Sequence, residues 1–152
     1  MFRRFATTTL LLIIAVSLLL ITLNNTSDKV VLKTGDTYYT PGQFNDCKWL
    51  MSIGRTLTSR PGDSTPVRIG IPSKENGGYV KGVIESGPNN NLILAFKPLG
   101  LSEVSPPIIM TAVYDLSSVP LPIVKFTWFR SSTMVINLYK TEAACLAAAK
   151  NR

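Results

Sequence analysis

Short apolar segments alternate with clusters of turn-forming residues from residue 28 to residue 140. This repeating pattern restricts the possible folds more than any other feature. The segments are rich in β-branched and aromatic residues, which favour strands. The clusters between them contain Pro, Gly, Asn and Ser, which suit tight reversals. The segments cover residues 28–33, 47–57, 66–71, 79–85, 92–96, 108–115, 123–130 and 134–140. The sequence therefore predicts about seven or eight short antiparallel strands.

Two local patterns refine this prediction near the start of the domain. Residues 40–43 have a capping-box arrangement with proline at the first helical position, which predicts a single helical turn. From residue 47 to residue 57, apolar and polar residues alternate with the period of a half-buried strand, and Leu50 and Arg55 are the exceptions. We therefore expect one turn followed by one long strand.

The end of the chain changes character and predicts a helix over residues 142–150. Thr141 is a suitable cap, Glu142 is an acidic residue in the first turn, and Lys150 is a basic residue in the last turn. Alanines fill much of the segment between them and favour helix. The expected fold class is mainly β, a small antiparallel β-sandwich or partly open barrel, with this C-terminal helix and an N-terminal transmembrane helix.

The transmembrane prediction rests on residues 5–23, a run of 19 residues without a charge. A helix of this length reaches about 28 Å, close to the roughly 30 Å hydrocarbon core of a bilayer. The run does not end in the small-x-small pattern of a cleavage site, so a retained anchor is favoured over a cleaved leader. The expected anchor residues include Phe5, Leu10, Leu12, Ile14, Leu18, Leu20 and Leu23.

Charge at the start of the chain predicts the orientation of that anchor. Arg3 and Arg4 precede the apolar run, and positive charge favours the cytoplasmic side. Residues 1–4 are then cytoplasmic, residues 24–27 form a short stem, and residues 28–152 form one extracytoplasmic domain. The expected location is the inner (cytoplasmic) membrane, with the domain in the periplasm or extracellular space.

The chain has two cysteines, Cys47 and Cys145. In an oxidising compartment a lone pair in a small domain is typical of a disulfide, which here would close a loop of about a hundred residues. Two unrelated buried thiols are the alternative, because sequence does not reveal proximity. The absence of histidine and of CxxC spacing argues against a zinc or redox site, so we expect neither metal nor cofactor.

Composition also argues against catalysis and nucleic-acid binding. The nine acidic residues are scattered singly, and without histidine no serine-hydrolase triad of the usual kind can form. We expect no catalytic residue, although a carboxylate pair such as Glu85 with Asp115 is formally possible. The net charge of +7 falls to +5 without Arg3 and Arg4, and the basic residues are dispersed. Anionic lipid headgroups suit such a surface better than nucleic acid.

These features favour a single-pass, non-enzymatic accessory or interaction subunit of a membrane or cell-envelope complex, with the bilayer and membrane-complex proteins as partners. Val119 and Leu121, beside the prolines at 120 and 122, are the candidate partner contacts, and a kinked connection over the core is the alternative. A ligand-binding or inhibitor module for a lipid, glycan or foreign protein is the alternative function, and it predicts an open apolar pocket. A carboxylate-dependent hydrolase is the weaker alternative.

Overall fold

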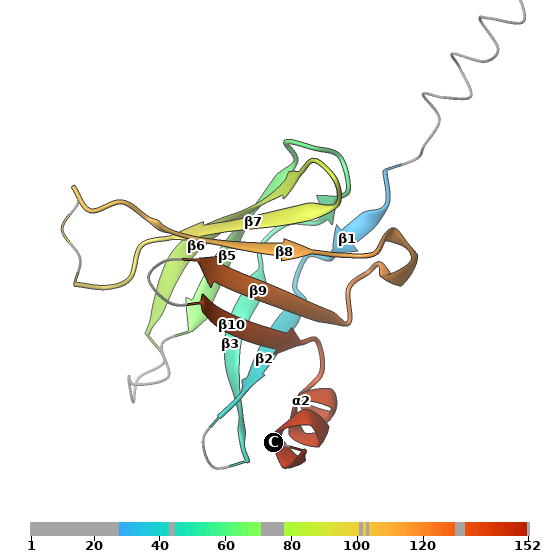
Figure 1. The fold of residues 1–152 in the computed structure, drawn as a ribbon, viewed down its shortest axis with the longest axis vertical. Coiled ribbons are helices and arrows are strands. Elements are labelled where there is room, and N and C mark those ends of the chain that lie inside the picture. The colour runs from blue at the N-terminus through green and yellow to red at the C-terminus, as the bar shows by residue number, and fades with distance from the viewer. Residues whose placement is uncertain are drawn as a thin grey trace, which may run out of the picture.

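The computed structural model describes residues 28–42, 45–70, 78–100, 102, 104–129 and 133–151. They form a closed antiparallel barrel of eight strands with a C-terminal helix (Figure 1). The prediction of a mainly β domain with a C-terminal helix is confirmed. The sandwich and the partly open barrel are corrected to a closed barrel, because the last strand pairs with the first strand of the barrel sheet.

The barrel strands follow one another in chain order around the wall, namely β2, β3, β5, β6, β7, β8, β9 and β10, and β10 closes against β2. Two further strands, β1 and β4, pair in a separate small sheet. The elements are β1(Val30–Leu32), β2(Thr37–Pro41), β3(Cys47–Ile53), β4(Leu57–Thr58), β5(Ser64–Gly70), β6(Tyr79–Gly87), β7(Asn91–Phe96), β8(Ile108–Val113), the 3₁₀ helix η1(Leu116–Ser118), β9(Ile123–Phe129), β10(Thr133–Tyr139) and α2(Glu142–Lys150).

The helical turn expected at residues 40–43 is wrong. Thr40 and Pro41 belong to strand β2, which the sequence did not reveal. Strand β2 pairs with β3 at five positions, from Thr37 with Ser52 to Pro41 with Cys47. This long-range pairing overrides the local capping pattern. Proline fits at Pro41 because this is the last residue of the strand.

The long strand expected over residues 47–57 is interrupted, and its exceptions mark the irregularities. Met51 pairs with Tyr38 while Trp49 pairs with Tyr39, so Leu50 is an extra residue without a partner in β2. Such a bulge changes which face successive side chains occupy. Leu50 and Met51 consequently both line the inside of the barrel.

The same bulge turns Trp49 to the outer wall, away from the face that simple alternation predicts for it. A Cβ atom added to Gly70 would lie 2.4 Å from a ring carbon of Trp49, so the indole covers this glycine. Gly70 pairs with Tyr79, whose side chain is exposed on the outside of β6. The glycine therefore makes room for the indole on the outer wall.

The core fills the barrel from the inward-facing side of every strand. Strand β6 shows the pattern most regularly, with exposed and buried residues alternating from Tyr79 to Ser86. The small sheet adds Leu32 and Leu57, which are both fully buried. Burial of these side chains supplies the hydrophobic stabilisation of the fold.

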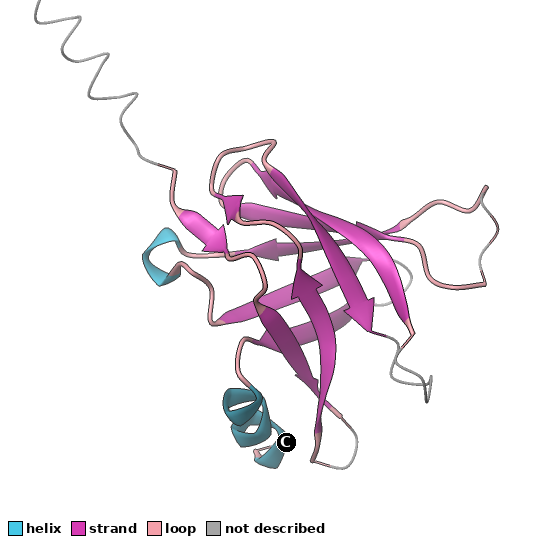
Figure 2. Ribbon diagram, turned by 180° about the vertical axis from the view of Figure 1, so that it is seen from behind, coloured by secondary structure: helices cyan, strands magenta, loops and turns pink. Residues whose placement is uncertain are grey.

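Helix α2 lies outside the barrel wall, beside β2 and β3 (Figure 2). The Thr141 side chain accepts a hydrogen bond from the Ala144 amide at 3.2 Å and caps the helix. Cys145 is fully buried and forms a disulfide with Cys47, with 6.0 Å between the Cα atoms. The predicted disulfide is confirmed, and it fixes the end of the chain to the start of β3.

The predicted membrane anchor, residues 5–23, lies outside the described residues, as do Arg3, Arg4 and the stem at residues 24–27. In the part of the chain that the structure describes, no helix is long and apolar enough to cross a membrane.

Candidate apolar binding site

The two ends of the barrel differ, and the first strand closes one of them. Because the strands are antiparallel, successive connections lie at alternate ends. Strand β1 and the residues just before it contact the connections at residues 59–63 and 114–122. These connections lie at one end of the barrel, which we call the closed end. Here the Lys29 amide donates to Ser59 Oγ at 3.0 Å, and the Leu121 amide donates to the Val31 carbonyl at 3.0 Å.

Hydrogen bonds to buried groups hold the closed end together. The Tyr38 hydroxyl donates to the Leu121 carbonyl at 2.8 Å, and burial raises the pKa of Tyr38 well above its usual value. The Asp63 carboxylate accepts from the Thr58 amide at 2.8 Å and from the Thr58 hydroxyl at 2.7 Å. These bonds lower the pKa of Asp63. Strand β1 and the connections bonded to it therefore fill the closed end of the barrel, and we call them the plug.

Of the two candidate partner contacts, Val119 and Leu121, the structure buries Leu121. Its side chain is 3 % exposed and belongs to the core. Val119 is half-buried and packs against the same core. The alternative, a kinked connection over the core, describes this segment, because the backbone of Leu121 is tied to β1 and its side chain points inward.

The opposite end, which we call the open end, leads into an apolar cavity of about 130 Å³ inside the barrel. Among the residues that the structure describes, every side chain that lines it is aliphatic, aromatic or methionine. Met51 and Met110 are almost fully buried in its wall. Leu50, Phe96 and Ile136 also line it and are only half-buried, so the cavity approaches solvent beside them. Phe96 ends β7 where that strand reaches the open end.

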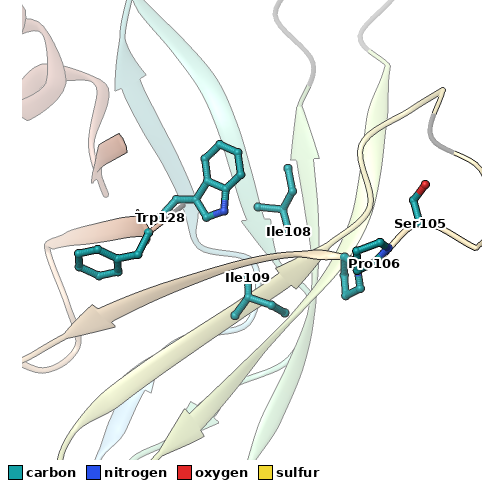
Figure 3. A pocket seen from close by; sticks show the side chains of 7 residues that line it. Ser105, Pro106, Ile108, Ile109 and Trp128 are labelled. Carbon is teal, nitrogen blue, oxygen red and sulfur yellow. The ribbon is translucent and has the colours of Figure 1, made fainter. Parts of the chain in front are cut away.

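A second apolar depression, of about 440 Å³, lies at the same end between β8 and β9 (Figure 3). Ile108 and Ile109 point to opposite sides of β8, and Ile108 lies on the same side as Trp128 (Figure 3). Phe129 borders this groove and is 72 % exposed. The groove therefore extends the apolar surface from the barrel interior to the outer wall.

Further apolar side chains stand exposed on the strand ends and connections of the open end. They are Tyr79, Leu99, Val104, Phe129 and Met134, and we call them the apolar rim. The Arg68 guanidinium lies 5.1 Å from the centre of the Tyr79 ring and helps to hold it. Apolar surface gathered at one place on a soluble domain is typical of an interaction site.

The acidic side chains named in the sequence analysis have defined positions in the described part of the chain. No group of three or more His, Cys, Asp or Glu residues there could hold a metal ion. The Asp115 carboxylate accepts a hydrogen bond from the Ser117 amide at 2.8 Å and starts η1, and this bond lowers the pKa of Asp115. Glu85 is exposed on the outer wall of β6.

Sequence reasoning found none of the cavity residues as a site. Except for Leu50, which breaks the alternation of residues 47–57, each of them has the sequence pattern of an ordinary core position of a strand. These positions line a cavity because the barrel closes around them while the plug fills one end of it.

Comparisons with protein-family models, with curated proteins and with solved structures found no match to this chain.

Proposed function

We propose that this chain is a membrane-anchored, non-enzymatic binding module whose open barrel end receives an apolar group of a ligand or partner. The observation that carries the proposal is the cavity of about 130 Å³ with a wholly apolar lining. Of the functions considered from the sequence, the ligand-binding module predicts this feature. The apolar rim and the groove beside β8 supply further contact surface for the bound molecule.

The cavity gives the binding a driving force. The side chains around a cavity of about 130 Å³ lack packing partners on one side, so a guest of matching size gains dispersion contacts with them. The guest also removes its own apolar surface from water. A cavity of similar size, about 150 Å³, is known to take benzene, so the guest is a small ring or a short branched chain.

The direction in which the open end points indicates where the bound molecule comes from. The described chain begins beside the closed end, and the connection between β7 and β8 lies at the far end of the barrel (Figure 1). With residues 5–23 anchored in a bilayer and a short stem, the open end faces away from that bilayer. The guest then comes from the surrounding compartment and not from the anchoring membrane.

Methionine methyl groups provide a direct test. The full chain in lipid nanodiscs is labelled with ¹³C at the methyl groups of its four methionines. Benzene is then titrated into the sample. Met51 and Met110 line the cavity, and their signals should move and saturate. The Met1 signal should remain in place or drift without saturation.

Two variants make this test decisive. Leu94→Phe fills the cavity from a lining position and should abolish the saturable shifts. Ile123→Phe adds the same ring on the exposed outer wall and should leave them unchanged. Absence of saturable shifts at both buried methionines in the folded natural chain would overturn the proposal.

A role as accessory subunit of an envelope complex is the second candidate, and the outer wall favours it. Register aligns Val83 with Ala95 and Ala95 with Ile109, which forms an apolar row across β6, β7 and β8. Val83 and Ile109 are both exposed. A partner protein at fixed stoichiometry should co-purify with the chain in mild detergent, and Ile109→Lys should release it while Lys81→Glu should not. Purification of the folded chain alone would contradict this role.

A further inference from the structure

Strand β10 pairs over different lengths with its two neighbours in the barrel, β9 and β2, and we call its boundary with β2 the seam. Strand β10 pairs with β9 at seven positions, from Thr133 with Phe129 to Tyr139 with Ile123. On its other side it pairs with β2 only through Tyr139 and Tyr39. Among the strands that the structure describes, none pairs with residues 133–137 of β10 on that side. This stretch is an open strand edge at the open end of the barrel.

The neighbouring strand explains why the pairing stops. The next position at which β2 could donate toward β10 is near Pro41, and proline has no backbone N–H. From there β2 follows β3, with which it pairs as far as Cys47. The disulfide from Cys47 to α2 holds this part of the chain on the outer side. The two strands therefore diverge from Tyr139 toward the open end.

Apolar side chains border the open edge. Met134 is 40 % exposed, and Ile136 lines the cavity while remaining half-buried. Leu50 lines the cavity from β3, on the other side of the seam. Side chains of a strand point alternately to its two faces. A strand added to β10 here would direct every second side chain toward the cavity.

Within the strands around this seam the charged residues have one sign, and Asp46 lies outside them in the connection just before β3. Strands β2, β3, β9 and β10 contain two charged residues, Lys48 and Lys125, and no carboxylate. Both lysines are exposed. A strand that docks between β10 and β2 is therefore favoured when it carries acidic residues.

We propose that the open edge of β10 binds an extended peptide segment of a partner protein as an additional strand. The segment has apolar residues at alternate positions, one of which enters the cavity, and acidic residues at its flanks. Main-chain hydrogen bonds to β10 provide affinity, and the cavity selects the side chain. This inference deepens the proposed function and rests on it, since the same cavity takes the inserted group.

A synthetic peptide tests the inference. The probe has nine residues, with leucine alternating with threonine and an aspartate at each end. It is added to the ¹⁵N-labelled full chain in nanodiscs, and exchange of the backbone amides with solvent is followed by NMR. Binding should slow exchange of those amides at residues 133–137 that point away from β9, and it should shift the methyl signals of Met51 and Met110 together. Amides of β6, which is paired on both sides, should not change.

Modified peptides separate strand pairing from simple apolar binding. Two further peptides carry methylated amide nitrogens, one along each edge. The peptide that loses the donors facing β10 should bind at least about tenfold more weakly, because each lost hydrogen bond contributes to the affinity. Lysines in place of the aspartates should also weaken it. Lys125→Glu should reverse this charge preference, whereas Lys81→Glu on the outer wall of β6 should not.

The outcomes distinguish this inference from the proposed function. If benzene binds in the cavity but the peptide leaves the β10 amides unprotected, strand addition is refuted and the binding role stands. Equal affinity of both edge-methylated peptides and the unmodified peptide also refutes it. If the peptide protects the β10 amides but Leu94→Phe binds it equally well, no side chain enters the cavity and the inference as stated fails.

Discussion

The disulfide offers the most quantitative prediction about this domain. The bond joins residues separated by 98 positions, and in the chain-entropy model a loop of about 100 residues stabilises the folded state by about 4.7 kcal/mol. Whole domains are stable by only about 5–15 kcal/mol. The double variant Cys47→Ser/Cys145→Ser should therefore lose a large share of the free energy of unfolding.

Urea unfolding of the full chain in nonionic detergent measures this loss. Fluorescence of Trp49 and Trp128 and circular dichroism follow the transition. The free energy of unfolding should fall by about 4–5 kcal/mol, and the urea m-value should rise because the unfolded chain without the bond exposes more surface. A loss below about 1 kcal/mol, measured with the bond confirmed in the natural chain, would refute the loop-closure argument.

A capping variant separates loop closure from stability of the helix itself. Thr141→Ala removes the side-chain acceptor for the Ala144 amide and should cost about 1 kcal/mol with the disulfide intact. A nine-residue helix is marginal in water by itself, so the disulfide variant should also release α2. If Thr141→Ala costs as much as loss of the disulfide, helix docking and not loop closure accounts for the stabilisation.

Three further predictions concern the stability of the plug, the packing on the outer wall and the stability of the domain at acidic pH. Leu57→Ala empties a fully buried position of the plug and should cost about 2–5 kcal/mol by urea unfolding, whereas Val113→Ala, at a position 77 % exposed, should cost little. Gly70→Ala brings a Cβ to 2.4 Å from the Trp49 ring and should lower the melting temperature and change the near-ultraviolet circular dichroism; an unchanged spectrum would contradict the packing. The hydrogen bonds that Asp63 accepts lower its pKa, so its stabilisation is present above pH of about 4 and is lost as the pH falls through the lowered pKa. Asp63→Asn should flatten this acid dependence of stability, and an unchanged slope would exclude Asp63 as its source.

The positions of most elements could be predicted because their signals are local. Strand β6 alternates buried and exposed residues along its length, and the prolines and glycines around residues 59–64 and 87–91 mark the reversals beside it. Helix α2 has the predicted bounds because its cap, its end charges and its alanines act within one helix. Such elements need no information from distant parts of the chain.

The errors all involve contacts between distant residues. Strand β2 was missed because its partners, β3 and β10, override the turn signal at Pro41. The prolines beside Leu121 fit both an exposed contact loop and a kinked connection over the core, and contacts with the β1 backbone and the Tyr38 hydroxyl select the buried connection. Local residue preferences do not report such distant partners.

The sequence alone determined the β-rich character, the C-terminal helix and the two cysteines that form the bond, because these depend on residue type and near neighbours. Contacts between distant strands account for the closure of the sheet, the filling of one end of the barrel, and the open edge of β10 beside an apolar cavity. Closure depends on register between strands far apart in the chain, and the bulge at Leu50 shifts that register by one residue. The candidate site is a product of that register and not of any motif.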